Sequence, residues 1–244
     1  MIVIVLGMHR SGTSLVSSVL HAMGVRMGEP SHLERRDPQS QPSGYWEDQD
    51  FVSLNRQIIS RTGGHWHRPP ARDKIVKAAL DFEKEMRALI AIKQATIESL
   101  NVLADNDMGS AWIGWGWKDP RNCLTMEAWW PHVAVQHVRF VRVRRRQEGI
   151  VDSLIRRGEQ LGGVPADKQA GAWSAIIEDH EKRISNFFIR TGTKDKSVEV
   201  EFEHLVRPDG ALVMLTRIAT LLGLEGADYV EAMRAGTARI DFRE

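Results

Sequence analysis

A glycine-rich turn close to the first residue constrains the fold of this chain more than any other feature. Residues 2–6 form an apolar run of β-forming residues that stops at Gly7. Beyond Gly12, apolar residues recur at helical spacing over residues 15–23. This order predicts a strand, a tight turn and a helix at the start of an α/β fold.

The turn has the composition of an anion-binding site. Backbone N–H groups in the first turn of a helix face one point, where the helix dipole favours negative charge. Gly7, Gly12 and Ser14 match the P-loop pattern G-x-x-x-x-G-K-[ST], but Thr13 replaces its lysine and the nearest cation is Arg10. The pattern alone fits a phosphate site and also a plain tight connection. The residues expected to face an anion are Arg10, Ser11, Gly12, Thr13 and Ser14.

Length and composition limit the classes of protein. A chain of 244 residues can bury a large core, and we expect a single domain over 1–244. Because 33 Lys and Arg residues nearly balance 32 Asp and Glu residues, no overall charge directs the chain to nucleic acid or to an anionic membrane. The single cysteine, Cys123, excludes an internal disulfide framework and favours a small apolar filler in a reducing compartment. With no run of membrane-spanning length, we expect a cytoplasmic protein.

The rest of the chain alternates expected strands and helices. Strands are expected over the run that ends at Lys118, over 133–143 and over 197–202, and helices over 48–61, over 74–101, after 143 through 157, and from 203 to a cap at Gly223. Such alternation predicts a parallel sheet flanked by helices. The Pro-, Gly- and Ser-rich stretch 25–47 is expected to be a long ordered loop or lid, within insertions at about 25–72 and 74–110.

Three of the expected strands end in groups that bind anions. The first ends at the glycine-rich turn, the second at Lys118, and another at Arg144, Arg145 and Arg146, with Ser153 one helix later. Because ligands collect at the carboxyl ends of parallel strands, these groups converge and predict a phosphate-rich ligand. Arg144 and Arg146 alternate away from Arg145 on an extended backbone, so we expect them to be structural or solvated.

In this order the segments resemble the sulfotransferases that use 3′-phosphoadenosine 5′-phosphosulfate (PAPS), of the bacterial type that is also similar to the tyrosylprotein sulfotransferases. GMHRSGTSL at 7–15 resembles their 5′-phosphosulfate loop, and KDPRNCLT at 118–125 their Lys-Asp-Pro segment. RRQEGIVDSLIRR at 145–157 resembles their 3′-phosphate motif, and 198–224 their closing strand and helix. The resemblance implies an α/β, P-loop NTPase-like sulfotransferase fold.

Carried over residue by residue, the resemblance implies a PAPS site that needs no metal. Arg10 and the amides of the turn would hold the 5′-phosphosulfate, and Lys118 would stabilise charge on the sulfuryl group or the leaving oxygen. Arg145 and Ser153 would bind the 3′-phosphate, for which a forked guanidinium is suited. Arg157 follows Ser153 by one helical turn on the same face and joins them.

The proton acceptor is open between a carboxylate and two imidazoles. The Gly-aromatic-Glu pattern of GYWED resembles that of the bacterial enzymes and favours Glu47, although a Glu at this place can also interact with the dipole of the following helix. The loop GGHWHRPP offers His65 and His67, whose Trp and Pro neighbours favour packing or acceptor contact.

Two departures leave other functions open. Arg146-Gln147 replaces the commoner Asp-Pro or Asn-Pro after the phosphate arginine, and no Gly-rich basic segment near the C-terminus provides adenine contacts. A P-loop small-molecule kinase would need Mg²⁺ and a carboxylate at a strand end, for which only Asp119 is placed. A non-catalytic nucleotide-binding protein of the same fold is the other alternative. The expected acceptor is a carbohydrate, a small molecule, a lipid or a peptide.

Overall fold

A five-stranded parallel sheet forms the centre of the computed structural model, which describes residues 1–34, 44–107, 111–133 and 135–242. The strand order is β2-β3-β1-β4-β5. The strands are β1 Ile2–Leu6, β2 Val25–Arg26, β3 Gly114–Lys118, β4 Val138–Arg144 and β5 Ser197–Glu201. The expected α/β class with a parallel sheet is therefore confirmed.

The sheet is buried on both faces because successive side chains of each strand point to opposite sides. In β1, Ile2, Ile4 and Leu6 belong to one apolar cluster, whereas Val3 and Val5 belong to another. The continuous apolar run at 2–6 is the sequence signature of this two-sided burial.

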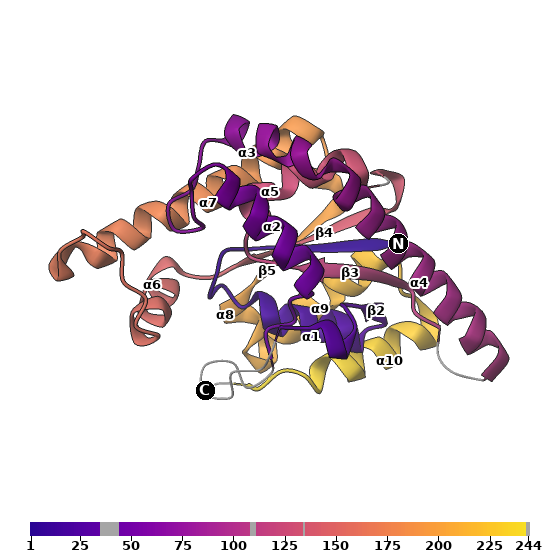
Figure 1. Cartoon of the computed structure of the whole chain (residues 1–244). Helices are drawn as coiled ribbons and strands as arrows, with labels where there is room; N and C mark the ends of the chain where they lie inside the picture. The colour runs from indigo at the N-terminus through magenta and orange to yellow at the C-terminus, as the bar shows by residue number, and fades with distance from the viewer. Residues whose placement is uncertain (35–43, 108–110, 134, 243–244) are drawn as a thin grey trace.

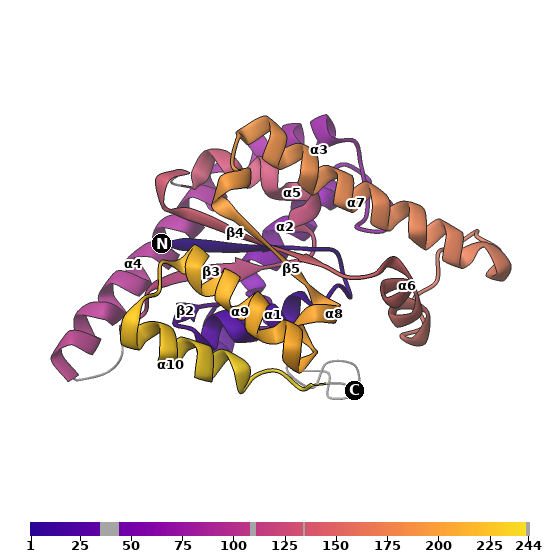
Figure 2. The ribbon, with the colours of Figure 1, turned by 180° about the vertical axis from the view of Figure 1, so that it is seen from behind.

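Helices cover the sheet in two layers, on the sides seen above and below it in Figure 1 and, from behind, in Figure 2. The first cluster joins the sheet to α2, α3, α4, α5 and α7, and the second joins it to α1, α9 and α10. Helix α6 lies beyond the carboxyl end of β4 (Figures 1 and 2). The helices are α1 Thr13–Ala22, α2 Gln49–Arg61, α3 Arg72–Ala79, α4 Glu83–Asp107, α5 Asn122–Trp129, α6 Gln147–Arg156, α7 Gln169–Thr191, α8 Phe202–Leu205, α9 Pro208–Leu222 and α10 Gly226–Thr237.

The connections create a crevice at the carboxyl edge of the sheet. From β1 the chain runs outward to β2, returns through β3, and then crosses to β4 on the other side of β1. The loops after β1 and β4 therefore leave in opposite directions, which is the place where open α/β sheets bind ligands.

Several expected boundaries shift in the structure. The strand expected over 133–143 begins only at Val138, because short 3₁₀ turns occupy the residues before it. The helix expected over 74–101 is two helices, α3 and α4, joined by one 3₁₀ turn at Leu80–Phe82. The last expected helix divides into α8 and α9 at Pro208, whose ring cannot continue a helix, and ends at Gly223 with φ 70° as expected.

The stretch expected to be a loop or lid at 25–47 contains regular structure at its start. Val25–Arg26 forms the edge strand β2, and a 3₁₀ turn follows at Pro30–His32. Residues 35–43 of this stretch lie outside the described residues. Among the described helices, none is both long and apolar enough to cross a bilayer.

Candidate active site

The loop between β1 and α1 closes tightly around its own backbone. The Ser11 hydroxyl and amide both donate to the Met8 carbonyl, at 2.7 and 3.2 Å. Gly12 has φ 98°, and a Cβ there would lie 2.2 Å from the ring of Phe202, so only glycine fits. The first helical bond runs from Val16 N–H to the Gly12 carbonyl, and the amides just before it have no acceptor within the helix. The loop thus presents the amides of a helix start to a ligand.

A cavity of ≈ 500 Å³ opens at this loop and is rich in cations. Seven of its lining side chains are basic: Arg10, Arg56, Lys118, Arg121, Arg145, Arg157 and Arg239. Four are acidic: Glu34, Glu47, Glu159 and Asp241. Among the described residues, the excess of positive charge makes the cavity suitable for a polyanionic ligand.

Three predicted phosphate residues meet on one side of this cavity. The Arg10 guanidinium donates from Nε to Ser153 Oγ at 2.9 Å, and Arg145 donates from Nη1 to the Arg10 carbonyl at 2.9 Å. Burial lowers the pKa of Arg10 from its usual value, and the positive charge of Arg157 lowers it further. The guanidinium of Arg145 lies 4.6 Å over the Phe202 ring. Like charges held this close favour an anion between them.

The backbone of Arg10 supports this placement. Its φ of 68° is in the left-handed region, which is uncommon for a residue with a Cβ and occurs at constrained sites.

Tyr45 connects the cavity to the segment before α2. Arg157 donates to the Tyr45 hydroxyl at 3.0 Å, and the Tyr45 carbonyl accepts from Ser14 Oγ at 3.0 Å. The segment before α2 is thereby tied to both the loop and α6.

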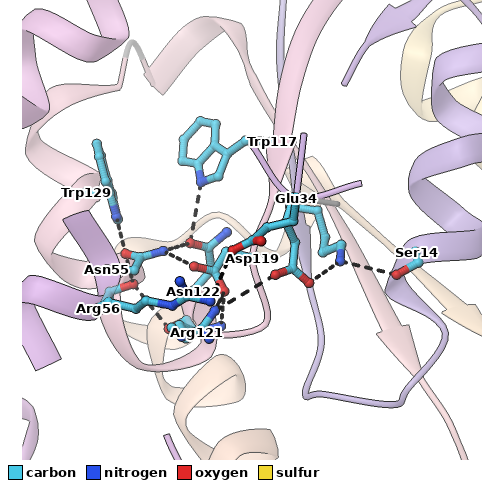
Figure 3. Close-up of polar contacts among 12 residues, drawn as sticks. Ser14, Glu34, Asn55, Arg56, Trp117, Asp119, Arg121, Asn122 and Trp129 are labelled. Carbon is cyan, nitrogen blue, oxygen red and sulfur yellow. Dashed lines mark hydrogen bonds and ion pairs between the residues drawn. The ribbon is translucent and has the colours of Figure 1, made fainter. Parts of the chain in front are cut away.

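The other side of the cavity holds the predicted reacting groups. Lys118, at the end of β3, is only 1% exposed; its Nζ lies 2.7 Å from Glu47 Oε1 and 3.3 Å from Ser14 Oγ. Arg121 Nη1 lies 4.0 Å from Glu47 Oε2 and 2.8 Å from Asp119 Oδ1. Figure 3 shows this chain of contacts running from Ser14 to Asn55. Lys118 and Glu47, far apart in sequence, are thus direct neighbours.

The imidazoles predicted as alternatives lie elsewhere. Neither His65 nor His67 lines the cavity, although Trp66, which stands between them in sequence, does. The centroids of the two imidazole rings lie 4.1 Å apart. Burial lowers the pKa of both histidines from the usual value. His9, inside the glycine-rich loop, does line the cavity and stacks on Trp66 at 4.1 Å.

Sequence reasoning missed His9 and Arg121 as cavity residues. Burial lowers the pKa of His9 well below its usual value, and the charges of Arg121 and Lys118 lower it further, so this imidazole is neutral near pH 7. The available signal was the position of each residue in a predicted site segment, with His9 directly before Arg10 and Arg121 three residues after Lys118.

The part of the chain that the structure describes contains no group of three or more His, Cys, Asp and Glu side chains that could together hold a metal ion. Cys123 is buried, and burial raises the pKa of its thiol, which fits the expected apolar filler.

Comparison with known families covers nearly the whole described fold. No curated protein matches the chain. A model of the sulfotransferase family matches residues 3–228, a span that contains the glycine-rich loop, the Lys118 segment, the Arg145 motif and the closing strand and helix. The chain therefore belongs to the sulfotransferase family.

Proposed function

We propose that the chain transfers the sulfuryl group of PAPS to a hydroxyl or amine of an acceptor. The observation that carries this proposal is that Arg10, Arg145 and Arg157 line one cavity together with the start of α1 and Lys118. Within this group, Arg10 donates to Ser153 Oγ and Arg145 donates to the Arg10 carbonyl. PAPS carries a 3′-phosphate and a 5′-phosphosulfate, so it needs two anion sites at the ends of one ribose. The Arg10–Ser153 contact joins two such sites.

The donor is held by groups from the loop after β1 and from the segment 145–157, which contains α6. Arg145, Ser153 and Arg157 bind the 3′-phosphate, with guanidinium forks matched to phosphate oxygens. The loop residues 10–14 hold the 5′-phosphosulfate through amides and through the Arg10 guanidinium. The Phe202 ring packs against the Arg145 guanidinium and stabilises its position through a cation–π contact.

The transfer step needs one base and cations on the departing oxygen. Glu47 takes the proton of the acceptor as the acceptor oxygen or nitrogen bonds to sulfur. The bond from sulfur to the bridging oxygen breaks, its electron pair passes to the 5′-phosphate oxygen, and Lys118 stabilises that charge. Because Lys118 Nζ contacts only one Glu47 oxygen, Oε1, the other oxygen of the carboxylate can receive the proton.

The position of Asp119 favours sulfuryl transfer over a kinase. A kinase would use this carboxylate to organise Mg²⁺. Asp119 is instead fully buried, and its oxygens accept from the Arg121 amide, the Arg121 guanidinium and Asn55. Its hydrogen-bonding capacity is directed into the protein.

Calorimetry with adenosine 3′,5′-bisphosphate in EDTA, compared with ATP and Mg²⁺, tests the donor assignment. We expect the bisphosphate to bind without metal and more tightly than ATP, and PAPS to be converted to bisphosphate when an acceptor panel of carbohydrates, phenols, lipids and peptides is added. Tight ATP–Mg²⁺ binding with no bisphosphate binding would establish the kinase instead. Bisphosphate binding without turnover on any acceptor would favour the non-catalytic alternative.

A further inference from the structure

A fully buried asparagine lies behind the proposed transfer site. Asn55, in the middle of α2, is 0% exposed, and its amide uses all of its hydrogen-bonding capacity. Its Nδ2 donates to Asp119 Oδ2 at 2.9 Å and to Asn122 Oδ1 at 3.0 Å. Its Oδ1 accepts from Thr125 Oγ1 at 2.7 Å and from Trp129 Nε1 at 2.8 Å. Figure 3 shows Asn55 at the centre of these contacts.

The two ends of the Asn55 amide serve different parts of the molecule. The carbonyl end contacts α5, deep in the protein, through Thr125 and Trp129. The NH₂ end contacts Asp119, in the turn between β3 and α5, and Asn122, the first residue of α5. Only the NH₂ end points along the path to the cavity.

Asp119 passes this restraint to Arg121. The fully buried carboxylate accepts from the Arg121 backbone amide at 2.9 Å and from its Nη1 at 2.8 Å. With one oxygen held by Asn55 and the other by Arg121, the carboxylate has a fixed orientation, and so does the guanidinium bonded to it. Arg121 is 12% exposed, lines the cavity, and approaches Glu47 Oε2 to 4.0 Å.

We propose that Asn55 is a positioning residue for sulfuryl transfer, acting through Asp119 to hold the Arg121 guanidinium beside the Glu47 carboxylate. This inference rests on the proposed function. Arg121 then presents a fixed positive charge beside the carboxylate oxygen that receives the acceptor proton. Small displacements of such groups reduce rates strongly, even when the altered residue lies away from the chemistry.

The division of the Asn55 amide supplies a matched control. Asn55→Ala removes both ends of the amide. Thr125→Val removes the bond from Thr125 Oγ1 to the carbonyl end and leaves the NH₂ end in place. It also removes a 3.2 Å bond from Thr125 Oγ1 to the Arg121 backbone carbonyl, but that carbonyl still accepts from the Thr125 amide at 3.1 Å. We expect Asn55→Ala to lower kcat about tenfold to a hundredfold, with the affinity for adenosine 3′,5′-bisphosphate unchanged within about threefold. Thr125→Val should lower the melting temperature and keep kcat within about twofold. Equal losses of kcat per folded molecule in both variants would overturn the proposal.

A double-mutant cycle with Arg121→Ala tests the route through Arg121. If Asn55 acts through this guanidinium, adding Asn55→Ala to Arg121→Ala should cause no further loss of kcat. A full, multiplicative second loss would show that Asn55 acts otherwise. Should Asn55→Ala fail to fold, Asp119→Asn preserves the side-chain shape and removes the charge that holds Arg121, and it should give the same kinetic result.

A third readout needs no turnover and separates this inference from the proposed function. The guanidinium NMR signals of Arg121, assigned by their loss in Arg121→Ala, should be distinct in the wild-type protein. They should move toward the position of solvated arginine in Asn55→Ala and stay unchanged in Thr125→Val. Unmoved signals in Asn55→Ala would refute the positioning role whether or not PAPS is the donor, whereas moved signals without sulfuryl transfer would leave the restraint intact and refute only the function.

Discussion

Two neighbouring arginines at the end of β4 have opposite surroundings. Arg144 is 54% exposed and pairs with Glu199 at 3.2 Å, on the sheet surface. Arg145 turns inward, where it donates to the Arg10 carbonyl and lies over Phe202. The alternation of an extended backbone produces this difference, as expected from the sequence. The pair therefore allows the proposed phosphate contact to be tested against an adjacent guanidinium.

Arg145→Ala should weaken binding of adenosine 3′,5′-bisphosphate about tenfold to a hundredfold. Loss of one hydrogen bond to a charged group costs about 1.5–3 kcal/mol, which corresponds to this range. Isothermal titration calorimetry at fixed ionic strength measures the effect. Arg144→Ala, which removes the same charge one residue away, should change the affinity less than about twofold, and equal losses in both variants would mean that only general charge matters.

Glu47→Gln should abolish most turnover and leave donor binding intact. The glutamine can still accept from Lys118, so the site keeps its shape, but it cannot take the acceptor proton. We expect a loss of about 10²–10⁴ in the single-turnover rate, the usual contribution of a general base. Glu34→Gln is the control, because Glu34 also lines the cavity but pairs with Arg56. Full activity in Glu47→Gln would transfer the role to His9, His65 or His67.

At the scale of elements, strands β1 and β5 were predictable because the pattern of apolar residues in each reflects its burial. The runs 2–6 and 197–202 are apolar or alternating, and each became a strand close to the expected bounds. The edge strand β2 has only two residues and no readable period, since its pairing with β3 rather than its own sequence defines it. Helices α5, α7 and α10 were not predicted, although α7 supplies Trp173 and Phe187 to the core.

In strand β3, alternating glycine and tryptophan residues determine how closely the strand packs against β1. In WGW at 115–117 the tryptophans join the apolar cluster on one face, and the glycine between them approaches β1. A Cβ on Gly116 would lie 2.1 Å from the Val3 carbonyl oxygen and 3.0 Å from Met27 Sδ. The strand pair could accommodate a methyl group only by moving apart.

Gly116→Ala should therefore destabilise the protein by about 1–3 kcal/mol or more, the usual cost of overpacking. Urea unfolding followed by circular dichroism measures this free energy. Gly171→Ala is the matched control, because Gly171 lies in α7 and the methyl group of an alanine there would have no neighbouring atom within 4 Å. That substitution should stabilise the protein by about 0.5–1 kcal/mol through helix propensity. Similar destabilisation at both positions would contradict the close approach of β3 to β1.

At the scale of the whole molecule, charge is balanced overall and uneven locally. The net charge of +1 indicated no partner, yet among the residues that the structure describes seven basic ones line the cavity against four acidic ones. The basic residues at the ends of separate strands predicted this local excess of positive charge, because a parallel topology brings the carboxyl ends of the strands to one edge of the sheet. The contacts of Asn55 with Asp119, Thr125 and Trp129 could not be foretold, since they join α2 to residues 64 to 74 positions away.

A buried histidine links the stability of the whole fold to pH. His180 is 0% exposed in α7 and its Nδ1 lies 2.8 Å from the Ile176 carbonyl oxygen, so Nδ1 carries the proton of the neutral ring. Burial lowers its pKa from 6.5 to about 4, against the opposing effects of the Ile176 carbonyl and Asp179. Because the folded pKa lies below the unfolded one, the unfolded chain binds more protons between these values. The stabilisation is complete above the unfolded pKa of 6.5 and is lost as pH falls toward 4.

Lowering the pH from 7 to 5 should reduce the free energy of unfolding by about 2 kcal/mol through His180 alone. His9, whose pKa burial also lowers well below its usual value, should add to the loss. Urea titrations at both pH values measure the total, and His180→Gln isolates the share of His180, because glutamine keeps a donor for the Ile176 carbonyl and does not titrate. The variant should be less stable than wild type at pH 7 through poorer packing, yet lose about 2 kcal/mol less between pH 7 and 5. An equal pH dependence in variant and wild type would show that His180 protonates without unfolding the chain, and that its environment is open to water.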